Sequence, residues 1–178
     1  MRRITPCLWF DNEAEQAAKF YVSVFPSSKI KHVERYSVDT PSNKPIGSVM
    51  TVTFQLDGNE FMALNGGPYF AFNEAVSLMI PCENQEEINY YYKKLSADPK
   101  AEMCGWLKDK FGLSWQLIPK EFDKIMRSTG SEKKKRAMKA LLKMKRIDVK
   151  KLRIAAAGMR PRESKALQDR RSVSLQQT

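Results

Sequence analysis

The feature that most constrains this chain is a strand–helix unit that occurs twice. The apolar segment 4–10 precedes Asn12 and Glu15, and an apolar stripe at helical spacing follows them. A shift of 72 residues places Asn84 and Glu87 on the same pattern. Both Asn-x-x-Glu pairs have the spacing of a capping box, which marks a helix start. We therefore predict a duplicated unit in which a strand leads into an amphipathic helix.

Further extended segments follow each predicted helix. An Asp-Gly turn at 57–58 joins two of them into a hairpin. A second shift, of 54 residues, places Met62 on Gln116. The two shifts differ because the second unit is shorter in its middle. Together with 4–10, we predict strands at 29–36, 47–56, 60–64, 75–81, 103–108 and 113–119.

Gln116 is a polar residue in an otherwise apolar strand. Successive side chains of a strand point to opposite faces, so the Gln116 amide lies on the face away from Trp115. A buried amide without a partner costs a few kcal/mol. We therefore interpret Gln116 as part of a ligand site, with a plain surface position as the alternative. The aromatic rings of Trp9 and Trp115 are interpreted as core packing.

Composition excludes several classes of site and location. The chain has three cysteines and one histidine, so a zinc site of the usual Cys/His kind is excluded. The odd number of thiols, with no CxxC pair, fits a reducing cytoplasm. The apolar run after Arg2-Arg3 is too short for a signal peptide, and no stretch has membrane-spanning length. We predict a cytoplasmic protein without a membrane partner.

Positive charge is concentrated in the last third of the chain. Residues 1–119 hold 12 basic and 14 acidic side chains, a net charge of −2, whereas residues 120–178 hold 19 and 6, a net charge of +13. Within 121–158 we predict helices that start at Ser131 and at Asp148, the second ending near Gly158. We predict that 159–178 is a disordered basic tail. The charge run is interpreted as a solvated face, so nucleic acid is not expected as a partner.

Several strings of the sequence carry a resemblance to a known family. The strings are ITPCLWFDNEAEQAAKFY, SVMTVTFQLDG, LNGGPYFAFNEA, IPCENQEEINYYYKKL, CGWLKDKFGLSWQLIPK and AMKALLKMKRIDVKKL. They resemble the PhnB-like branch of the vicinal oxygen chelate (VOC) superfamily, which includes glyoxalases and bleomycin-resistance proteins. The resemblance implies an α+β fold in which two paired βαβββ modules, 1–67 and 74–120, form a half-barrel cleft within a domain spanning 1–120. A C-terminal helical extension follows, and a homodimer is implied.

Members of this branch are often labelled demethylubiquinone methyltransferase. A methyltransferase of the usual kind needs a glycine-rich turn between a strand and a helix, where it cradles its cofactor. The only glycine pair, Gly66-Gly67, leaves a strand and meets Pro68 and aromatic residues instead of a helix. We therefore expect no cofactor of this kind.

Metal-dependent relatives in the superfamily place ligands on the first and last strand of each module. The internal repeat carries those positions to Thr5, Met62, Ser77 and Gln116, with Ile4 or Pro6 replacing Thr5 if the first strand is shifted by one. None is a histidine or a carboxylate, which hard and borderline divalent metals require. We expect a metal-independent pocket for a small organic molecule, lined by Thr5, Met62, Asn65, Ser77, Cys104, Trp106 and Gln116.

Three functions remain open at this point. The first is binding or sequestration of a small molecule, as in bleomycin resistance. The alternative is a small-molecule enzyme of the superfamily, a lyase, isomerase or transferase, with Gln116, Ser77 or Cys104 assisting. The third is association with nucleic acid through the basic tail. Cys104 is interpreted first as a packed residue, and His32 as a residue on a surface strand.

Overall fold

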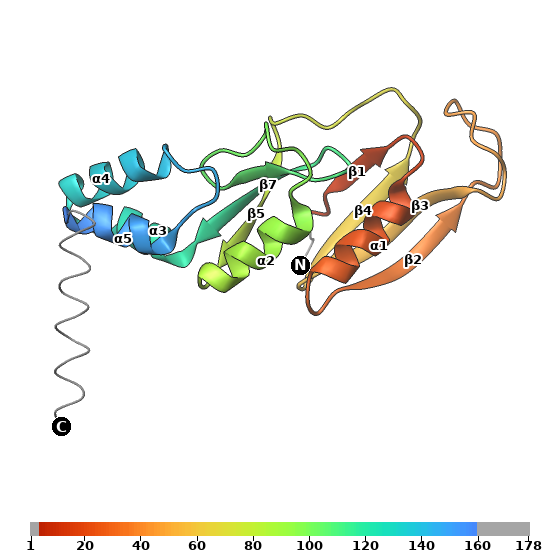
Figure 1. Cartoon of the computed structure of the whole chain (residues 1–178). Coiled ribbons are helices and arrows are strands. Elements are labelled where there is room, and N and C mark those ends of the chain that lie inside the picture. Colours follow the sequence, from red (N-terminus) through yellow and green to blue (C-terminus); the bar gives the residue numbers. More distant parts are fainter. Residues whose placement is uncertain (1–3, 160–178) are drawn as a thin grey trace. The chain divides into compact units, whose positions relative to one another are not determined.

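The computed structural model describes residues 4–159 and forms two compact units (Figure 1). The first unit contains residues up to Val76 together with Phe111–Leu113. The second contains Ser77–Lys110 and the chain from Ser114 onward. The predicted disordered tail lies outside the described residues except for its first, Met159. No helix within 4–159 is long and apolar enough to cross a membrane.

The first unit is a four-stranded sheet with one helix packed on a face. The strand order is β1-β4-β3-β2, in which β1 pairs with β4 in parallel and the other pairs are antiparallel. Helix α1 buries its alanines and Tyr21 against that face, where Phe54 is stacked on Tyr21. The Phe111 ring makes edge-to-face contacts with the rings of Phe10, Phe20 and Tyr21. The elements are β1 (Cys7–Phe10), α1 (Ala14–Val24), β2 (Lys29–Arg35), β3 (Val49–Leu56) and β4 (Asn59–Asn65).

The start of α1 differs from the predicted capping box. Asn12 makes no capping bond, because its Oδ1 accepts a hydrogen bond from Lys44 at 2.6 Å. The Ala14 N–H donates instead to Oδ1 of Asn65, 2.8 Å away. Glu15 pairs with Lys19 one turn further along. The capping-box prediction at Asn12 is therefore wrong: a residue from β4, 51 positions away, supplies the acceptor that the sequence pattern assigned to Asn12.

The second unit repeats the plan with a smaller sheet. It contains β5 (Ser77–Cys82), α2 (Gln85–Leu95), β6 (Trp106–Lys108) and β7 (Ser114–Pro119), in the sheet order β5-β7-β6. The Asn84 half of its capping box is confirmed, since Oδ1 of Asn84 accepts from the Glu87 N–H at 2.9 Å. The Glu87 carboxylate accepts from the Glu83 N–H at 2.8 Å, one residue before Asn84. The described part of this unit has three strands, one fewer than a full βαβββ module. The strand is lacking in the middle of the unit, where the sequence is shorter.

The hydrogen-bond register confirms both repeat shifts. In the first unit β1 runs parallel to β4 with Cys7 opposite Met62. In the second, β5 runs parallel to β7 with Met79 opposite Gln116. The shift of 72 takes Cys7 to Met79, and the shift of 54 takes Met62 to Gln116. The α+β fold with two related modules is therefore confirmed.

Three helices follow β7 and share a core of their own. They are α3 (Lys120–Arg127), α4 (Ser131–Leu141) and α5 (Val149–Ala157). The prediction for α5 is confirmed at both ends: Asp148 accepts from the Lys151 N–H at 2.9 Å, and Gly158 ends the helix at φ +75°. Helix α3 was not predicted. The shared core consists of Ile125, Ala137, Leu141, Ile147, Leu152 and Ala156.

Hydrogen bonds fix these helices to the rest of the second unit. The Cys104 N–H donates to the Met144 carbonyl at 2.7 Å. The Gln85 side chain donates through Nε2 to the Ile147 carbonyl at 3.0 Å and accepts through Oε1 from the Val149 N–H at 2.9 Å. One amide therefore satisfies two backbone groups at the start of α5. The extension is an integral part of the second unit, because the turn at Cys104–Gly105 and helix α2 hold it at several points.

We predict that Gln85→Glu destabilises the C-terminal helices. The substitution removes the donor to the Ile147 carbonyl and sets a carboxylate against it, at a cost of about 1–3 kcal/mol in the free energy of unfolding. Protonation of the new carboxyl below roughly pH 4 restores a donor, so the cost shrinks in acid. Hydrogen exchange over 142–157 measures it, with the exposed Glu86→Gln as control. Equal protection in both variants would contradict this account.

Candidate functional site

Each sheet has one face against a helix and one open face. In β7, Trp115 and Leu117 are buried, whereas Gln116 between them is half-exposed. The prediction that Gln116 and Trp115 lie on opposite faces is confirmed. Gln116 pairs across the sheet with Met79 on one side and Trp106 on the other. A polar amide therefore sits in the middle of a row whose outer members are a thioether and an indole.

Ser77 lies two residues before Met79 and shares its face. Nε2 of Gln116 donates to Oγ of Ser77 at 2.8 Å. The structure thus brings together two of the residues that the sequence assigned to the site, and Trp106 adjoins them through its pairing with Gln116. Ser77, Trp106 and Gln116 are all half-exposed, so they can meet a solute.

Trp115 belongs to the opposite side of this sheet. Its side chain is 2% exposed, and its indole Nε1 donates to Oδ2 of Asp109 at 2.8 Å. Asp109 is itself only 3% exposed. The interpretation of Trp115 as a packing residue is confirmed, and its buried polar partner explains how an indole N–H is accommodated there.

The open face of the first unit carries the equivalent row. Cys7, Met62 and Thr53 lie side by side across β1, β4 and β3. Thr5 precedes β1 by two residues and is half-exposed. Met62 has only a thioether sulfur, a weak acceptor, so this row offers less hydrogen bonding than the row of Gln116. Cys7 is a member of the row that the sequence reasoning did not identify.

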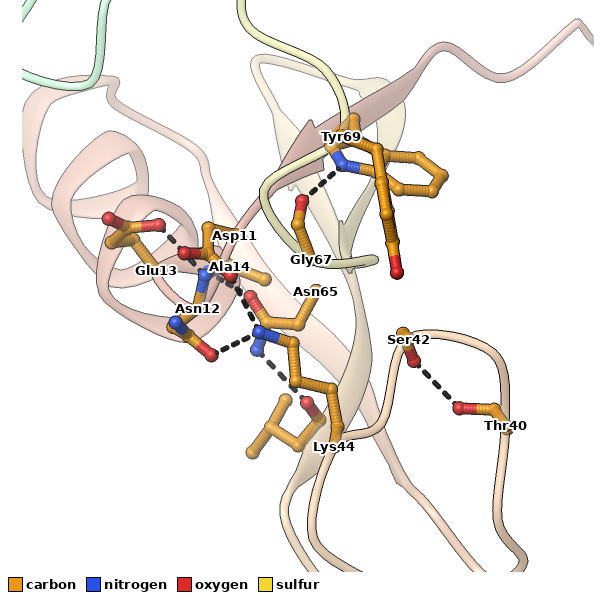
Figure 2. A network of polar contacts seen from close by, with 12 residues as sticks. Asp11, Asn12, Glu13, Ala14, Thr40, Ser42, Lys44, Asn65, Gly67 and Tyr69 are labelled. Atoms are coloured by element: carbon orange, nitrogen blue, oxygen red, sulfur yellow. Dashed lines mark hydrogen bonds and ion pairs between the residues drawn. The ribbon is translucent and has the colours of Figure 1, made fainter.

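Asn65 has a structural task that its prediction as a pocket residue missed. It is 6% exposed, its Oδ1 accepts from the Ala14 N–H, and its Nδ2 donates to the Val49 carbonyl at 2.9 Å. The Tyr36 hydroxyl donates to the Asn65 carbonyl (2.5 Å). Figure 2 shows this side chain between the start of α1 and the start of β3. Because both ends of the amide are engaged by backbone, we leave Asn65 out of the proposed site.

Lys44 joins the loop between β2 and β3 to the same region. Its Nζ lies 2.6 Å from Oδ1 of Asp11 and 2.6 Å from Oδ1 of Asn12, and its side chain is 12% exposed (Figure 2). Ser42 donates to the Tyr36 hydroxyl at 3.1 Å from the same loop. No local sequence signal points to the Lys44 contacts, because Lys44 lies 33 and 32 residues along the chain from Asp11 and Asn12.

The Trp9 ring of the same unit occupies the space beside the glycine pair Gly66-Gly67. A Cβ built on Gly66 would lie 2.2 Å from a ring carbon of Trp9. The Gly67 carbonyl accepts a hydrogen bond from Trp9 Nε1 at 2.8 Å, and Gly67 has φ +95°. The pair therefore exists for close packing and a left-handed turn, and it does not form a cradle that fits a methyl-donor cofactor.

Comparison with known proteins places the chain in a family. The model of the 3-demethylubiquinone-9 3-methyltransferase family matches residues 2–118. This chain belongs to that family. The predicted resemblance to the PhnB-like branch is confirmed by the same match and by the similarity to the PhnB protein described next.

The PhnB protein from Bacillus cereus is 36% identical to this family member, with a TM-score of 0.55, over 66% of this chain and 99% of that one. Protein PA1353 from Pseudomonas aeruginosa is 18% identical, with a TM-score of 0.51, over 67% of this chain and 98% of that one. A glyoxylase/bleomycin resistance protein/dioxygenase domain from Frankia sp. EAN1pec is 13% identical, with a TM-score of 0.44, over 67% of this chain and 92% of that one. No curated protein matches the sequence.

The residues at the superfamily's metal positions do not fit a divalent metal in this family member. Ser77 and Gln116 are hydrogen-bonded to each other, and the only possible ligand atom of the Met62 side chain is its thioether sulfur. Neither carboxylate nor imidazole occurs among the four positions, and these are the ligands that such metals need. Within residues 4–159 no group of three or more His, Cys, Asp or Glu side chains could hold a metal ion. Metal independence remains a proposal.

The cysteines and the histidine show no catalytic arrangement in the described units. Cys104 is half-buried and packs against the core of the C-terminal helices. Burial raises the pKa of the Cys82 thiol to about 12, with Glu87 adding to the shift, so the reactive thiolate is scarce at neutral pH. His32 is exposed, and its Nε2 lies 3.0 Å from Oε2 of Glu34. The interpretations of Cys104 as packed and His32 as a surface residue agree with these positions.

We predict that Gly66→Ala destabilises the first unit through its contact with the Trp9 indole. Overpacking of this kind costs about 1–3 kcal/mol in the free energy of unfolding. In a Trp9→Leu background the ring is gone, so the same substitution should cost under about 1 kcal/mol. Urea unfolding of the four proteins of this double-mutant cycle measures the coupling. If the two costs are equal, the indole is not what makes glycine necessary at position 66.

Proposed function

We propose that this family member binds a small organic molecule on the open sheet faces without a metal ion, in a sequestering or resistance role. The observation that carries the proposal is the Gln116–Ser77 pair, which lies half-exposed beside Trp106 and Met79. Small-molecule sites typically combine apolar and aromatic walls with a few placed polar groups. This row has that make-up.

The side chains of the row favour a particular kind of ligand. The Trp106 ring offers a flat surface on which an aromatic or conjugated molecule can stack. Met79 is 62% exposed and adds a flexible apolar contact. The Gln116 amide offers both a donor and an acceptor. We therefore propose a flat, largely apolar ligand that carries at least one hydrogen-bonding group near its ring.

Binding is favoured over catalysis by the chemistry of the same residues. Ser77, Met79, Trp106 and Gln116 carry no group that exchanges a proton near neutral pH, which general acid–base catalysis needs. Ser77 is hydrogen-bonded to an amide, and an amide is no base that could activate the hydroxyl as a nucleophile. Retention of the ligand needs none of these groups.

An enzyme remains the second candidate, and the description of the matched family is what favours it. The name 3-demethylubiquinone-9 3-methyltransferase suggests a transferase acting on a quinone-like ring. Such a ring fits the flat, apolar ligand proposed above. The glycine pair offers no support for a methyl donor, so this candidate needs another place for its cofactor. Product analysis by mass spectrometry after incubation with a quinol and a methyl donor distinguishes the two.

Three broader features belong to the same proposal. We propose that residues 1–120, as modules 1–67 and 74–120, make up the ligand-binding domain, with helices at 121–158. We propose that two copies associate as a homodimer, as the family resemblance implies. We also propose a cytoplasmic location, since all three cysteines are free thiols.

A thermal-shift screen in EDTA tests the proposal, using bleomycin and a panel of aromatic acids and quinones. A ligand at 100 times its Kd should raise the free energy of unfolding by about 2.7 kcal/mol. Gln116→Ala removes one hydrogen bond, which should weaken binding by roughly three- to tenfold. Gln16→Ala, an exposed amide on α1, is the matched control and should leave the affinity unchanged.

Two results would contradict the proposal. One is a ligand whose binding is abolished by EDTA and restored by a divalent metal, which would place a metal in the site. The other is equal affinity in wild type and Gln116→Ala, which would remove the amide from the site. Turnover of a bound compound would leave binding in place and favour the enzyme.

A further inference from the structure

A stripe of lysines runs along the exposed side of α4 and the turn after it. Lys135, Lys139 and Lys143 are spaced four residues apart, which places them on one side of a helix about 6 Å apart along the axis. All three are exposed. We call these three residues the basic stripe. It lies beyond the part of the chain that the family model matches, which ends at residue 118.

The acidic residues around the stripe are already engaged. Residues 120–159 contain 14 basic and 4 acidic side chains, a net charge of +10. Each of the four acids pairs with a cation of the same segment: Glu121 with Arg153, Asp123 with Arg127, Glu132 with Lys135 and Asp148 with Lys151. The excess positive charge is therefore not neutralised within this segment. Lys139 and Lys143 form no ion pair with any described residue.

The apolar side of α4 needs no partner. Ala137 and Leu141 are buried in the core shared with α3 and α5, and Met138 packs partly against it. This side is therefore covered by the helices of the second unit itself. Apart from Leu142 at its C-terminal end, which is 61% exposed, only the charged side of α4 is left to interact with something else.

The arrangement of charges is unfavourable for the isolated helix. Like charges four residues apart repel, at about 0.2–0.5 kcal/mol per pair. Lys133 and Lys134 stand near the helix start, where the helix dipole favours acidic residues. A polyanion lying along the stripe would relieve the repulsion between its lysines. The basic stripe therefore has a physical reason to bind negative charge, beyond the pairing of Lys135 with Glu132 and the favourable place of Lys139 in the last turn of α4.

We propose that the basic stripe binds double-stranded nucleic acid through its phosphates, without reading sequence. Neutralising phosphates needs lysines and arginines in a row, and it needs no apolar contact. Single strands are held by aromatic stacking, and α4 contains no aromatic residue. A membrane-surface helix needs an exposed apolar face, and the apolar face of α4 is buried. This binding is separate from the proposed ligand site and depends on other residues.

Fluorescence anisotropy of the full chain with a short labelled DNA or RNA duplex tests the proposal. Binding should weaken as salt rises from about 50 to 200 mM, and each phosphate contact contributes about 0.9 to the slope of log K against log salt. Lys139→Gln/Lys143→Gln should lower that slope by about 1.8. Lys93→Gln/Lys100→Gln removes the same charge from exposed positions elsewhere in the second unit and should leave the slope unchanged.

Several results would overturn the proposal. Equal losses in both double variants would mean that net charge alone is responsible. Loss of binding in full-length Arg170→Gln/Arg171→Gln, with Lys139→Gln/Lys143→Gln unaffected, would assign binding to the tail. Sedimentation with phosphatidylserine vesicles, combined with no affinity for either duplex, would make the partner a membrane. Absence of duplex binding by the wild type at about 50 mM salt would also refute it.

Discussion

The parallel pairing between the first and last strands of each unit is the constraint on which the rest of the structure depends. Parallel strands need a crossover, which the helix and intervening strands provide. The register, Cys7 with Met62 and Met79 with Gln116, decides which side chains meet the helix and which stay open. A slip of one residue would turn Gln116 into the core and Trp115 out of it. Both the buried core and the candidate site follow from this one register.

Much of the fold could be predicted because its signals are local. Asp148 and Gly158 mark the two ends of α5 in the sequence. The alternation of side chains along a strand predicts which sheet face carries Gln116. The start of α1 could not be predicted, because the acceptor for its first N–H is the Asn65 side chain on the neighbouring strand β4, 51 residues further along the chain. Asn65 was assigned to the pocket for the same reason, as polarity alone does not distinguish a ligand contact from a backbone contact. Helix α3 was missed because it is short and buries only Ile125.

The candidate site was partly accessible to sequence reasoning through the internal repeat. The repeat brought Ser77 and Gln116 to equivalent strands, and the structure joins them by a hydrogen bond. It did not identify Cys7, whose relation to Met62 becomes visible only in the register. The glycine pair Gly66-Gly67, which does not form the cofactor turn that a methyltransferase of the usual kind needs, packs against Trp9. The family name suggests a transferase, whereas the side chains of the Gln116 row are the basis of our proposal of binding.

The indole resonances of the three tryptophans provide the most direct test of metal-independent binding at the open face. In an NMR titration with a compound from the thermal-shift screen, in EDTA, the indole N–H of half-exposed Trp106 should shift and saturate. That of Trp115 should stay in place, because it is buried and bonded to Asp109 on the other side of the sheet. A shift at Trp115 with none at Trp106, or shifts that appear only after a divalent metal is added, would contradict the account.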